Sequence, residues 1–357
     1  MAKQESNLPK MNTRIASVLL PALLVTSVSA QEPPDMSPAK ELAKYEPWIG
    51  NWKGSGKMLE PTGDSTNWTS ESTYQWVLNK HFVQEEFIIK FEGLDVPMTF
   101  RNYLGWDREN QRYVSASASN QGICRVNAVS FLPDGTMMQM IRHDLDGVPY
   151  MERAKAKAAG DSLSMQIDVL MSDGASTKMI DCKLTRSDKA FECDWGEDAW
   201  MGVTPNDHMK KLRAIRGHYE TKGEMVMVPG MPTMKITGTD RFMMIWDGNV
   251  MHGTTLGYVE GAPEAYESHA FWGWDGLRGC ISAVFVDNMG QIGQMDVRWV
   301  EDKLVSISSA LKMGQPATQH FVRTLSRKGQ LKSAIGHTCM GAMKPFVSFK
   351  ASYVKKG

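Results

Sequence analysis

The sequence predicts an all-β protein made of two tandem antiparallel β-barrels, each preceded by a short helix. Three observations lead to this prediction. The chain contains an internal repeat, in which Gly50 recurs as Gly217, 167 residues later. Each copy consists of short segments rich in β-branched and aromatic residues, separated by Gly, Asp and Asn. Such segments are typical of antiparallel strands joined by tight turns. A Ser-Pro or Thr-Pro step begins a short apolar segment ahead of each copy.

Residues 1–30 have the pattern of a secretory signal peptide and are not expected to belong to the fold. Arg14 precedes the apolar run 15–25, and the segment 26–30 ends in small residues at Ala30. This order of charge, apolar run and small residues is typical of export signals. We expect cleavage after Ala30 and a periplasmic or secreted protein with no integral membrane segment. Translation could start at Met1 or at Met11, and the sequence leaves both open.

The segments before the two copies are predicted to be short helices. Ser37-Pro38 starts the first segment and Thr204-Pro205 starts the second. Ser and Thr accept hydrogen bonds from free N–H groups, and Pro suits the first position of a helix. Apolar residues then recur three positions apart, as expected for one buried helix face. These residues are Leu42, Tyr45 and Trp48 in the first segment and Met209, Leu212 and Ile215 in the second.

The two copies divide the mature chain into a first domain, residues 31–200, and a second domain, residues 201–357. Each domain offers some eight to ten short strands, which fits an antiparallel sandwich or a closed barrel. We favour the barrel, whose interior can hold one small ligand. Clear strand segments include 82–91, 98–104 and 112–118 in the first copy and 250–259, 266–274 and 280–286 in the second.

The start of each copy resembles the Gly-x-Trp start of lipocalin-like barrels. The motifs are Gly50-Asn51-Trp52 and Gly217-His218-Tyr219, each after a short helix. The pattern Gly-x-Trp-x-Gly-x-Gly at 50–56, followed by Leu-Gly-Trp-Asp at 104–107, is similar to an uncharacterised bacterial family of secreted lipocalin-like (calycin-type) domains. The second copy departs from this pattern, because Tyr219 replaces the Trp. The sequence assigns no late-strand Arg of the kind that closes the base of lipocalins.

The charge balance and the missing motifs disfavour several function classes. The 40 basic and 40 acidic residues cancel, so the chain lacks the basic stripe of a nucleic-acid binder. It carries no nucleophile elbow, phosphate loop or dinucleotide fingerprint. No compact His motif predicts a metal site. Common hydrolase, kinase and dehydrogenase functions are therefore disfavoured, although whether the protein is an enzyme stays uncertain.

One disulfide is possible among the five cysteines. Cys182 and Cys193 flank a polar segment, and they would face each other if Ser187-Asp188 formed a hairpin turn. An exported protein would meet conditions that allow this bond. The other cysteines are expected to be small buried residues.

Polar residues at matching positions inside the predicted strands are the candidate ligand-binding residues. If their faces point inward, they could orient a carboxylate, a polar head group or a haem, because inward and outward residues alternate along a barrel strand. The opposite assignment places them in water, and the sequence leaves both open. The set comprises Glu86, Arg101 and Asn120 in the first copy and His252, His269 and Asn288 in the second.

The predicted function is that of an exported binding protein whose partner is a small apolar or amphipathic molecule held in a barrel. An alternative is an isomerase, lyase or cyclase that uses a buried His, Glu or Arg as acid–base group. A third hypothesis is a haem-binding barrel with His252 and His269 as ligands, although no cofactor is predicted outright. One copy could also serve only as a packing partner of the other. The oligomeric state is not set by the sequence.

Overall fold

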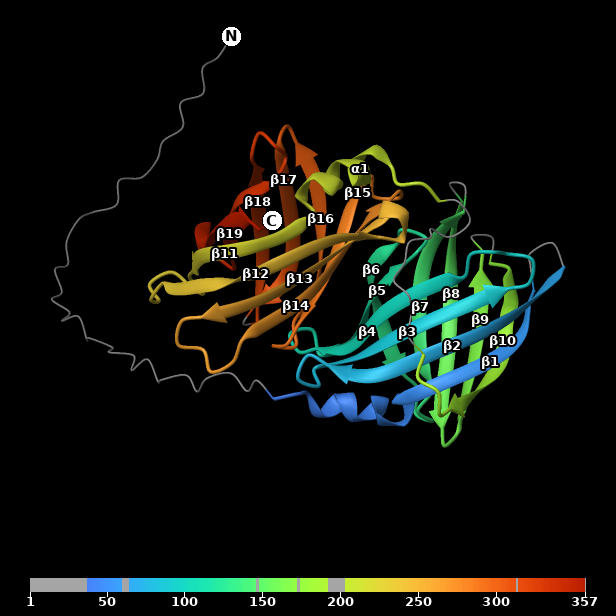
Figure 1. Cartoon of the computed structure of the whole chain (residues 1–357). Helices are drawn as coiled ribbons and strands as arrows, with labels where there is room; N and C mark the ends of the chain where they lie inside the picture. Colours follow the sequence, from blue (N-terminus) through green and yellow to red (C-terminus); the bar gives the residue numbers. More distant parts are fainter. Residues whose placement is uncertain are drawn as a thin grey trace, which may run out of the picture. The chain divides into compact units, whose positions relative to one another are not determined.

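The structure, a computed structural model, consists of two closed antiparallel barrels of ten strands each (Figure 1). It describes residues 37–59, 64–145, 148–171, 174–191, 203–312 and 314–356. The predicted signal peptide and Cys193 lie outside the described residues. In each barrel every strand pairs with its neighbours in sequence, and the last strand closes on the first. The predicted all-β class and the tandem barrels are confirmed.

Barrel 1 is preceded by the 3-10 helix η1 (Lys40–Trp48). Its strand β3 covers the same residues as the predicted segment, and β4 ends at Asp107, where the Gly-Trp-Asp turn is predicted. The strands are β1 (Gly50–Leu59), β2 (Ser65–Val77), β3 (Phe82–Phe91), β4 (Met98–Asp107), β5 (Arg112–Ser119), β6 (Cys124–Phe131), β7 (Met137–Leu145), β8 (Val148–Ala159), β9 (Ser162–Leu170) and β10 (Ser176–Ser187).

Barrel 2 is preceded by α1 (Asp207–Leu212) and the short 3-10 helix η3 (Arg213–Ile215). A further 3-10 turn, η4 (Trp246–Gly248), joins its second and third strands. The strands are β11 (Gly217–Met225), β12 (Met234–Ile245), β13 (Val250–Val259), β14 (Tyr266–Asp275), β15 (Cys280–Asp287), β16 (Ile292–Val300), β17 (Lys303–Lys312), β18 (Gln315–Leu325), β19 (Leu331–Met340) and β20 (Phe346–Lys355).

Both predicted helices are present, but they start later than the Ser-Pro and Thr-Pro steps indicate. η1 begins at Lys40 with no side-chain cap. In α1 the cap is Asn206, whose side chain accepts a hydrogen bond from the backbone N–H of Met209 at 3.0 Å. The helices bury the predicted apolar faces, so their packing follows the sequence pattern even though their caps do not.

Arg186, in the last strand of barrel 1, ties the end of η1 to the barrel. Its guanidinium lies 4.4 Å from the centre of the Trp52 ring and donates to the carbonyls of Ile49 at 2.7 Å and Pro47 at 3.1 Å. Sequence analysis did not single out this arginine. In barrel 2 the corresponding contact is looser, since Lys355 lies 6.0 Å from the Tyr219 ring.

The glycine that opens each copy is required by the backbone. Gly50 has φ 128° and Gly217 has φ 137°, a region that residues with a Cβ rarely adopt. A Cβ on Gly50 would also lie 2.5 Å from the Arg186 guanidinium. The glycine that opens Gly50-Asn51-Trp52 and Gly217-His218-Tyr219 therefore has a structural cause in both barrels.

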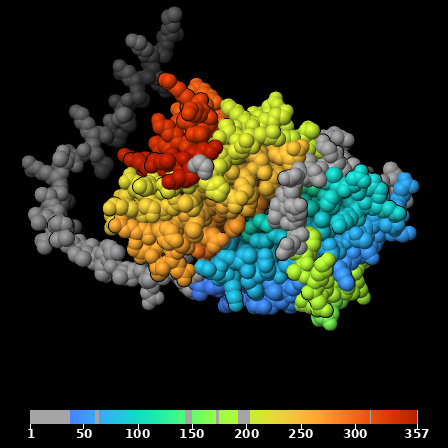
Figure 2. All heavy atoms as spheres, viewed as in Figure 1, coloured from blue at the N-terminus to red at the C-terminus, as the bar shows by residue number. Residues whose placement is uncertain are grey.

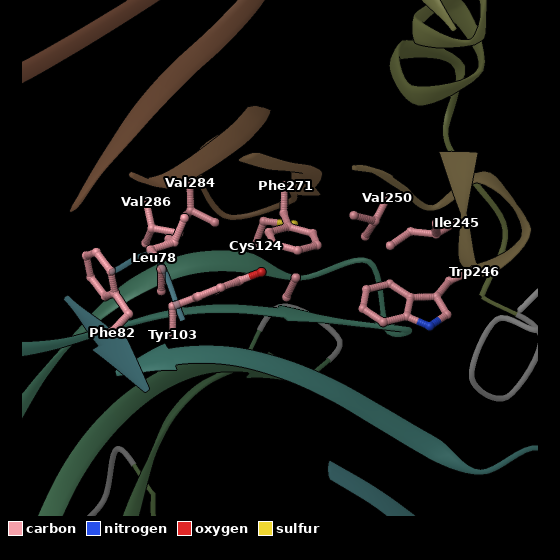
Figure 3. Close-up of a cluster of buried hydrophobic side chains, with 12 residues drawn as sticks. Leu78, Phe82, Tyr103, Cys124, Ile245, Trp246, Val250, Phe271, Val284 and Val286 are labelled. Atoms are coloured by element: carbon pink, nitrogen blue, oxygen red, sulfur yellow. The ribbon is translucent and has the colours of Figure 1, made fainter. Parts of the chain in front are cut away.

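Apolar side chains on the outer faces form a core shared by the two barrels (Figure 3). In Figure 2 the orange surface of β13 and β14 adjoins the cyan and blue surface of barrel 1. β6 pairs with β7 over three residue pairs only, and its first half contacts β14, β15 and β16 instead. The members of this shared core are Leu78, Phe82, Tyr103, Ala116, Ala118 and Cys124 from barrel 1 and Ile245, Trp246, Val250, Phe271, Val284 and Val286 from barrel 2.

A side chain of barrel 2 accepts a backbone hydrogen bond from β6, at a position where β6 is not paired with β7. The N–H of Val126 on β6 donates to Oε1 of Gln294 on β16 at 3.1 Å. Nε2 of Gln294 donates in turn to Ser282 at 2.7 Å. The contact between the barrels therefore includes a specific hydrogen bond as well as apolar packing. Over the residues that the structure describes, no helix is both long and apolar enough to cross a membrane.

Candidate functional site

The strand register places four of the predicted ligand-binding residues on the outer faces of the barrels. Glu86 pairs with Arg101 across β3 and β4, and His252 and His269 lie on β13 and β14 beside the outward Phe271. Of the two options that the sequence left open, the inward one does not hold for these four residues, and their role in ligand binding stays a prediction. They do not point into water either, because the two barrels pack against each other at this place.

The contact between the barrels brings these four residues into one cluster. Arg101 forms an ion pair with Glu86. Nε2 of His252 lies 3.2 Å from Nδ1 of His269, and the His252 ring stacks on Phe271 at 4.5 Å between centroids. Tyr103 of barrel 1 lies 5.7 Å from the His269 ring of barrel 2. Side chains from both repeats thus meet at the contact between the barrels and not inside either barrel.

Burial keeps both imidazoles of this cluster neutral. Desolvation, reinforced by the nearby His269 and Arg101, lowers the pKa of His252 to about 3. Burial also lowers the pKa of His269, although Glu267, at 3.5 Å, acts in the opposite direction. A neutral imidazole is the form that binds a metal or haem. These two rings, however, bond to each other and do not line a barrel interior.

Asn120 and Asn288 act as structural links in their own barrels. The side-chain oxygen of Asn120 accepts from the N–H of Thr99 at 3.0 Å, and its amide donates to the carbonyl of Pro97 at 2.8 Å. Asn288 makes the same two bonds, to Glu267 and Ala265. Asn120 thus holds the β5–β6 turn against the start of β4, and Asn288 holds the β15–β16 turn against the start of β14. This shared role explains why the asparagine occurs in both copies.

The possible disulfide partner Cys193 lies outside the described residues. Cys182 is half-buried on β10 and packs against the apolar core of barrel 1. Burial raises the pKa of its thiol to about 11, so the thiol is protonated at neutral pH. The pairing of these two cysteines stays a prediction.

The interior of barrel 1 contains a carboxyl group that sequence analysis missed. Glu85 pairs with Tyr74 on β2 and with Asn102 on β4, and all three point inward. The Tyr74 hydroxyl donates to Oε1 of Glu85, and the Asn102 amide donates to Oε2 at 2.6 Å. Burial raises the pKa of Glu85, while these two hydrogen bonds act in the opposite direction. The group is therefore a desolvated carboxyl held in a fixed orientation.

Part of the Glu85 side chain stays accessible although the residue points into the barrel. It is surrounded by protein, and yet its side chain is only half-buried by accessible area. The inward side chains of Phe87, Phe100 and Asn102 are also half-buried. Inside a closed barrel, surface of this kind faces the interior, and a ten-stranded barrel is wider than the eight-stranded barrels that side chains can fill.

Unused hydrogen-bonding groups surround the same interior. They belong to inward residues of β2 and β5 and to the helix that covers one end of the barrel. Buried polar atoms normally have a partner, which is a protein group, water or a ligand. Among the described residues no partner is found for the hydroxyls of Tyr45, Ser70, Ser72 and Ser119 or for the indole N–H of Trp68.

Barrel 2 lacks this carboxyl group. Gly253 stands where barrel 1 has Glu85, and Phe242 and Ala270 replace Tyr74 and Asn102. The Phe242 ring lies 3.1 Å from the position that a Cβ on Gly253 would take, so it fills part of the space. Sequence analysis compared the outward residues of these strands and passed over Glu85, which lies between Gln84 and Glu86. The signal that could have identified Glu85 is its difference from Gly253, the matching residue of the second copy.

An open hollow lies on barrel 2 where β11 and β20 separate. The two strands pair only from Tyr219 onward, and the hollow beside this end has a volume of about 390 Å³. Side chains that point into the barrel and side chains that point outward both line this hollow, so the hollow lies at the barrel wall. Its lining includes Gly217, His218, Arg241, Phe242, Met244 and Lys355.

Comparisons with known proteins leave the family of this chain unassigned. No protein family and no curated protein matches it. A crystal structure of Rv2717c from M. tuberculosis is 17% identical, covers 42% of this chain and 99% of its own, and has a TM-score of 0.33. A DUF3598 protein of unknown function from Nostoc punctiforme is 11% identical over 89% and 100% of the two chains, with a TM-score of 0.26. Kievitone hydratase from Nectria haematococca is 9% identical over 90% and 94%, with a TM-score of 0.17. Each similarity is too low to assign a function here.

Proposed function

We propose that the protein is an exported, lipocalin-like binding protein that holds a small amphipathic molecule inside barrel 1. The polar end of this molecule would lie against Glu85, and its apolar body would lie against the inward aromatic side chains. The observation that carries the proposal is the Glu85, Tyr74 and Asn102 group, which is fixed by hydrogen bonds and faces interior space.

The environment of Glu85 favours an uncharged polar end on the ligand. Burial raises the pKa of this carboxyl, and its two oxygens accept hydrogen bonds from Tyr74 and Asn102. The hydroxyls of Ser70 and Ser72 can both donate and accept a hydrogen bond. A hydroxyl or carbonyl group on the ligand would therefore find complementary partners, whereas a carboxylate would meet an unfavourable acidic group.

Binding of dodecan-1-ol and dodecan-2-one tests the proposal. We expect one molecule per chain by native mass spectrometry. Glu85→Leu should weaken binding about tenfold, the value of one well-placed hydrogen bond in a closed site. Glu71→Leu is the matched control, because it makes the same change on the exposed outer face of β2. Equal affinity of the two variants would contradict the proposal.

An acid–base enzyme of the isomerase, lyase or cyclase type is the second candidate. The raised pKa of Glu85 beside the Tyr74 hydroxyl favours it, because such a pair can move a proton in a water-poor site. The molecules that co-purify with the wild type and with Glu85→Gln distinguish the two functions. A binding protein would retain the same compound in both, whereas an enzyme would hold its product in one and its substrate in the other.

Haem ligation by His252 and His269 has less support. Both rings lie on the outer face of barrel 2, and their nitrogens contact each other. A haem inside barrel 2 would require other ligands than the pair that the sequence suggested. Haemin titration followed by its absorption spectrum tests this directly, and a spectrum that His252→Gln abolishes would restore the hypothesis.

Export is the remaining part of the proposal, and it rests on the pattern of residues 1–30. We expect the protein recovered from the periplasm or the medium of its host to begin at Gln31. N-terminal sequencing measures this. A cytosolic protein that retains residues 1–30 would contradict export and would leave the ligand proposal untouched.

A further inference from the structure

The interior of barrel 2 contains a cationic side chain that the proposed function does not use. Arg323 on β18 pairs with Leu304 and Ala334, both of which are buried inward residues. Its Nη1 donates to the Ser306 hydroxyl at 2.8 Å. Its guanidinium lies 5.1 Å from the Trp272 ring, which belongs to the apolar core of this barrel. Arg323 is therefore held at a defined place inside the barrel.

This guanidinium makes no direct ion pair in the described part of the chain, although Asp240, which points into the same barrel, acts on it from farther away. Its one side-chain hydrogen bond there is the bond to Ser306, and no carboxylate lies within 4.0 Å of it. Asp240, an acidic group in its surroundings, accepts hydrogen bonds from Thr221 and Thr255 instead. A guanidinium stays protonated in proteins, and a charge that has lost part of its water is stabilised by a direct ionic partner. The geometry thus leaves a position for an anion.

Part of the Arg323 side chain also stays accessible although the residue points into the barrel. It is surrounded by protein but only half-buried by accessible area, like Glu85 in barrel 1. Aromatic side chains form the neighbouring wall: Phe321 lies 5.9 Å from the guanidinium, and the inward rings of Phe242 and Phe349 are half-buried. A cationic end and an apolar wall are what a molecule with an anionic end and an apolar body requires.

We infer that barrel 2 is a second binding site, which takes a small amphipathic carboxylate whose anionic end pairs with Arg323. A carboxylate fits best because it is planar and can accept two parallel hydrogen bonds from one guanidinium. Its apolar body lies along Trp272 and Phe321. This site is separate from the one in barrel 1 and takes a ligand of different charge.

The repeat supports this division between the barrels. The strand register sets Arg323 opposite Leu304, and it sets Ala156 opposite Met137 at the matching place in barrel 1. Barrel 1 therefore has a carboxyl at Glu85 and no arginine at this position. Barrel 2 has the arginine and a glycine in place of the carboxyl. The two interiors therefore differ at these two positions, and the interior of barrel 2 also contains Asp240, whose carboxyl accepts hydrogen bonds from Thr221 and Thr255.

Dodecanoate and its methyl ester are the probes for this site. They share one chain and differ in the negative charge. At neutral pH and below the micelle concentration, we expect wild-type protein to bind dodecanoate at least tenfold more tightly than methyl dodecanoate, as measured by calorimetry. This comparison needs no variant, so a folding defect cannot obscure it. Equal affinity for the two probes would overturn the inference.

Two variants assign the binding to barrel 2. Arg323→Met should lose at least tenfold in dodecanoate affinity, while Arg323→Lys should keep the preference for dodecanoate over the ester at lower affinity. Arg327→Met is the matched control, because Arg327 is exposed in the turn that follows β18. Dodecanoate binding that survives Arg323→Met, or that Glu85→Leu removes, would overturn the inference. Failure of dodecanol to bind barrel 1 would count only against the proposed function.

Discussion

Glu85 and Glu86 are neighbours on β3 with opposite environments. Glu85 points into barrel 1, where burial raises its pKa and two side chains hold it. Glu86 points outward and pairs with Arg101 beside the second barrel. The difference comes from the alternation of side chains along a strand. Adjacent residues therefore have different roles: Glu85 is a candidate binding group, whereas Glu86 lies in the contact between the barrels.

The pH dependence of stability depends on His252. Its pKa is about 3 in the folded protein against an ordinary value of 6.5, so the unfolded state binds more protons between these values. The free energy of unfolding must therefore fall as the pH falls below about 6.5. The loss due to His252 should reach about 2–3 kcal/mol near pH 4.5. His269 acts in the same direction.

Urea unfolding at pH 7.5 and at pH 4.5 measures this effect, with His252→Gln as the comparison. The variant should lose less stability on acidification than the wild type. Asp287 gives the opposite slope, because its pKa is raised to about 6 and its native state holds a proton that the unfolded state lacks. Both proteins contain Asp287, so the difference between them isolates His252. Identical pH dependence would show that the imidazole is hydrated in solution.

At the scale of elements, the local patterns of the sequence predicted the fold well. The repeat, the short helices and the turns at Gly-Trp-Asp depend on residues close in sequence, and the structure contains them. The orientation of β3, β4, β13 and β14 could not be predicted in this way. These strands have one face in a barrel and the other against the second barrel, so both faces are buried and the usual contrast between apolar and polar faces is weak.

The link between β10 and η1 is expected to stabilise barrel 1. Arg186 stacks on Trp52 and bonds two carbonyls at the end of the helix. Arg186→Met keeps much of the apolar stem but removes these bonds, and should cost about 1–2 kcal/mol because the side chain is partly exposed. Lys355→Met is the control, since its contact with Tyr219 is longer. Chemical unfolding followed by tryptophan fluorescence measures both. A larger loss from the Lys355 variant would contradict the role of Arg186.

At the scale of the whole molecule, the contact between the barrels explains why a duplicated chain keeps both copies. Phe271, Val284 and Val286 are at most 2% exposed, although they lie on the outside of barrel 2. Tyr103 and Phe82 cover them from barrel 1, and the Tyr103 hydroxyl points toward Phe271 (Figure 3). Each barrel thus supplies a surface that the other needs, even if their interiors bind different molecules.

Separating the barrels should therefore expose an apolar patch on each. We expect residues 31–200 and 201–357, expressed as two chains, to bind a hydrophobic dye and to unfold at lower temperature than the full chain, because buried apolar area contributes about 25 cal/mol per Å². Mixing the two chains should reduce dye binding, and Gln294→Ala in the second chain should weaken this recovery, since it removes the hydrogen bond to Val126. Ser308→Ala, on β17 and away from the contact, is the control. Separate barrels that stay monomeric, bind no dye and keep the stability of the full chain would show that the shared core is dispensable. The two barrels would then be independent domains joined only by the chain.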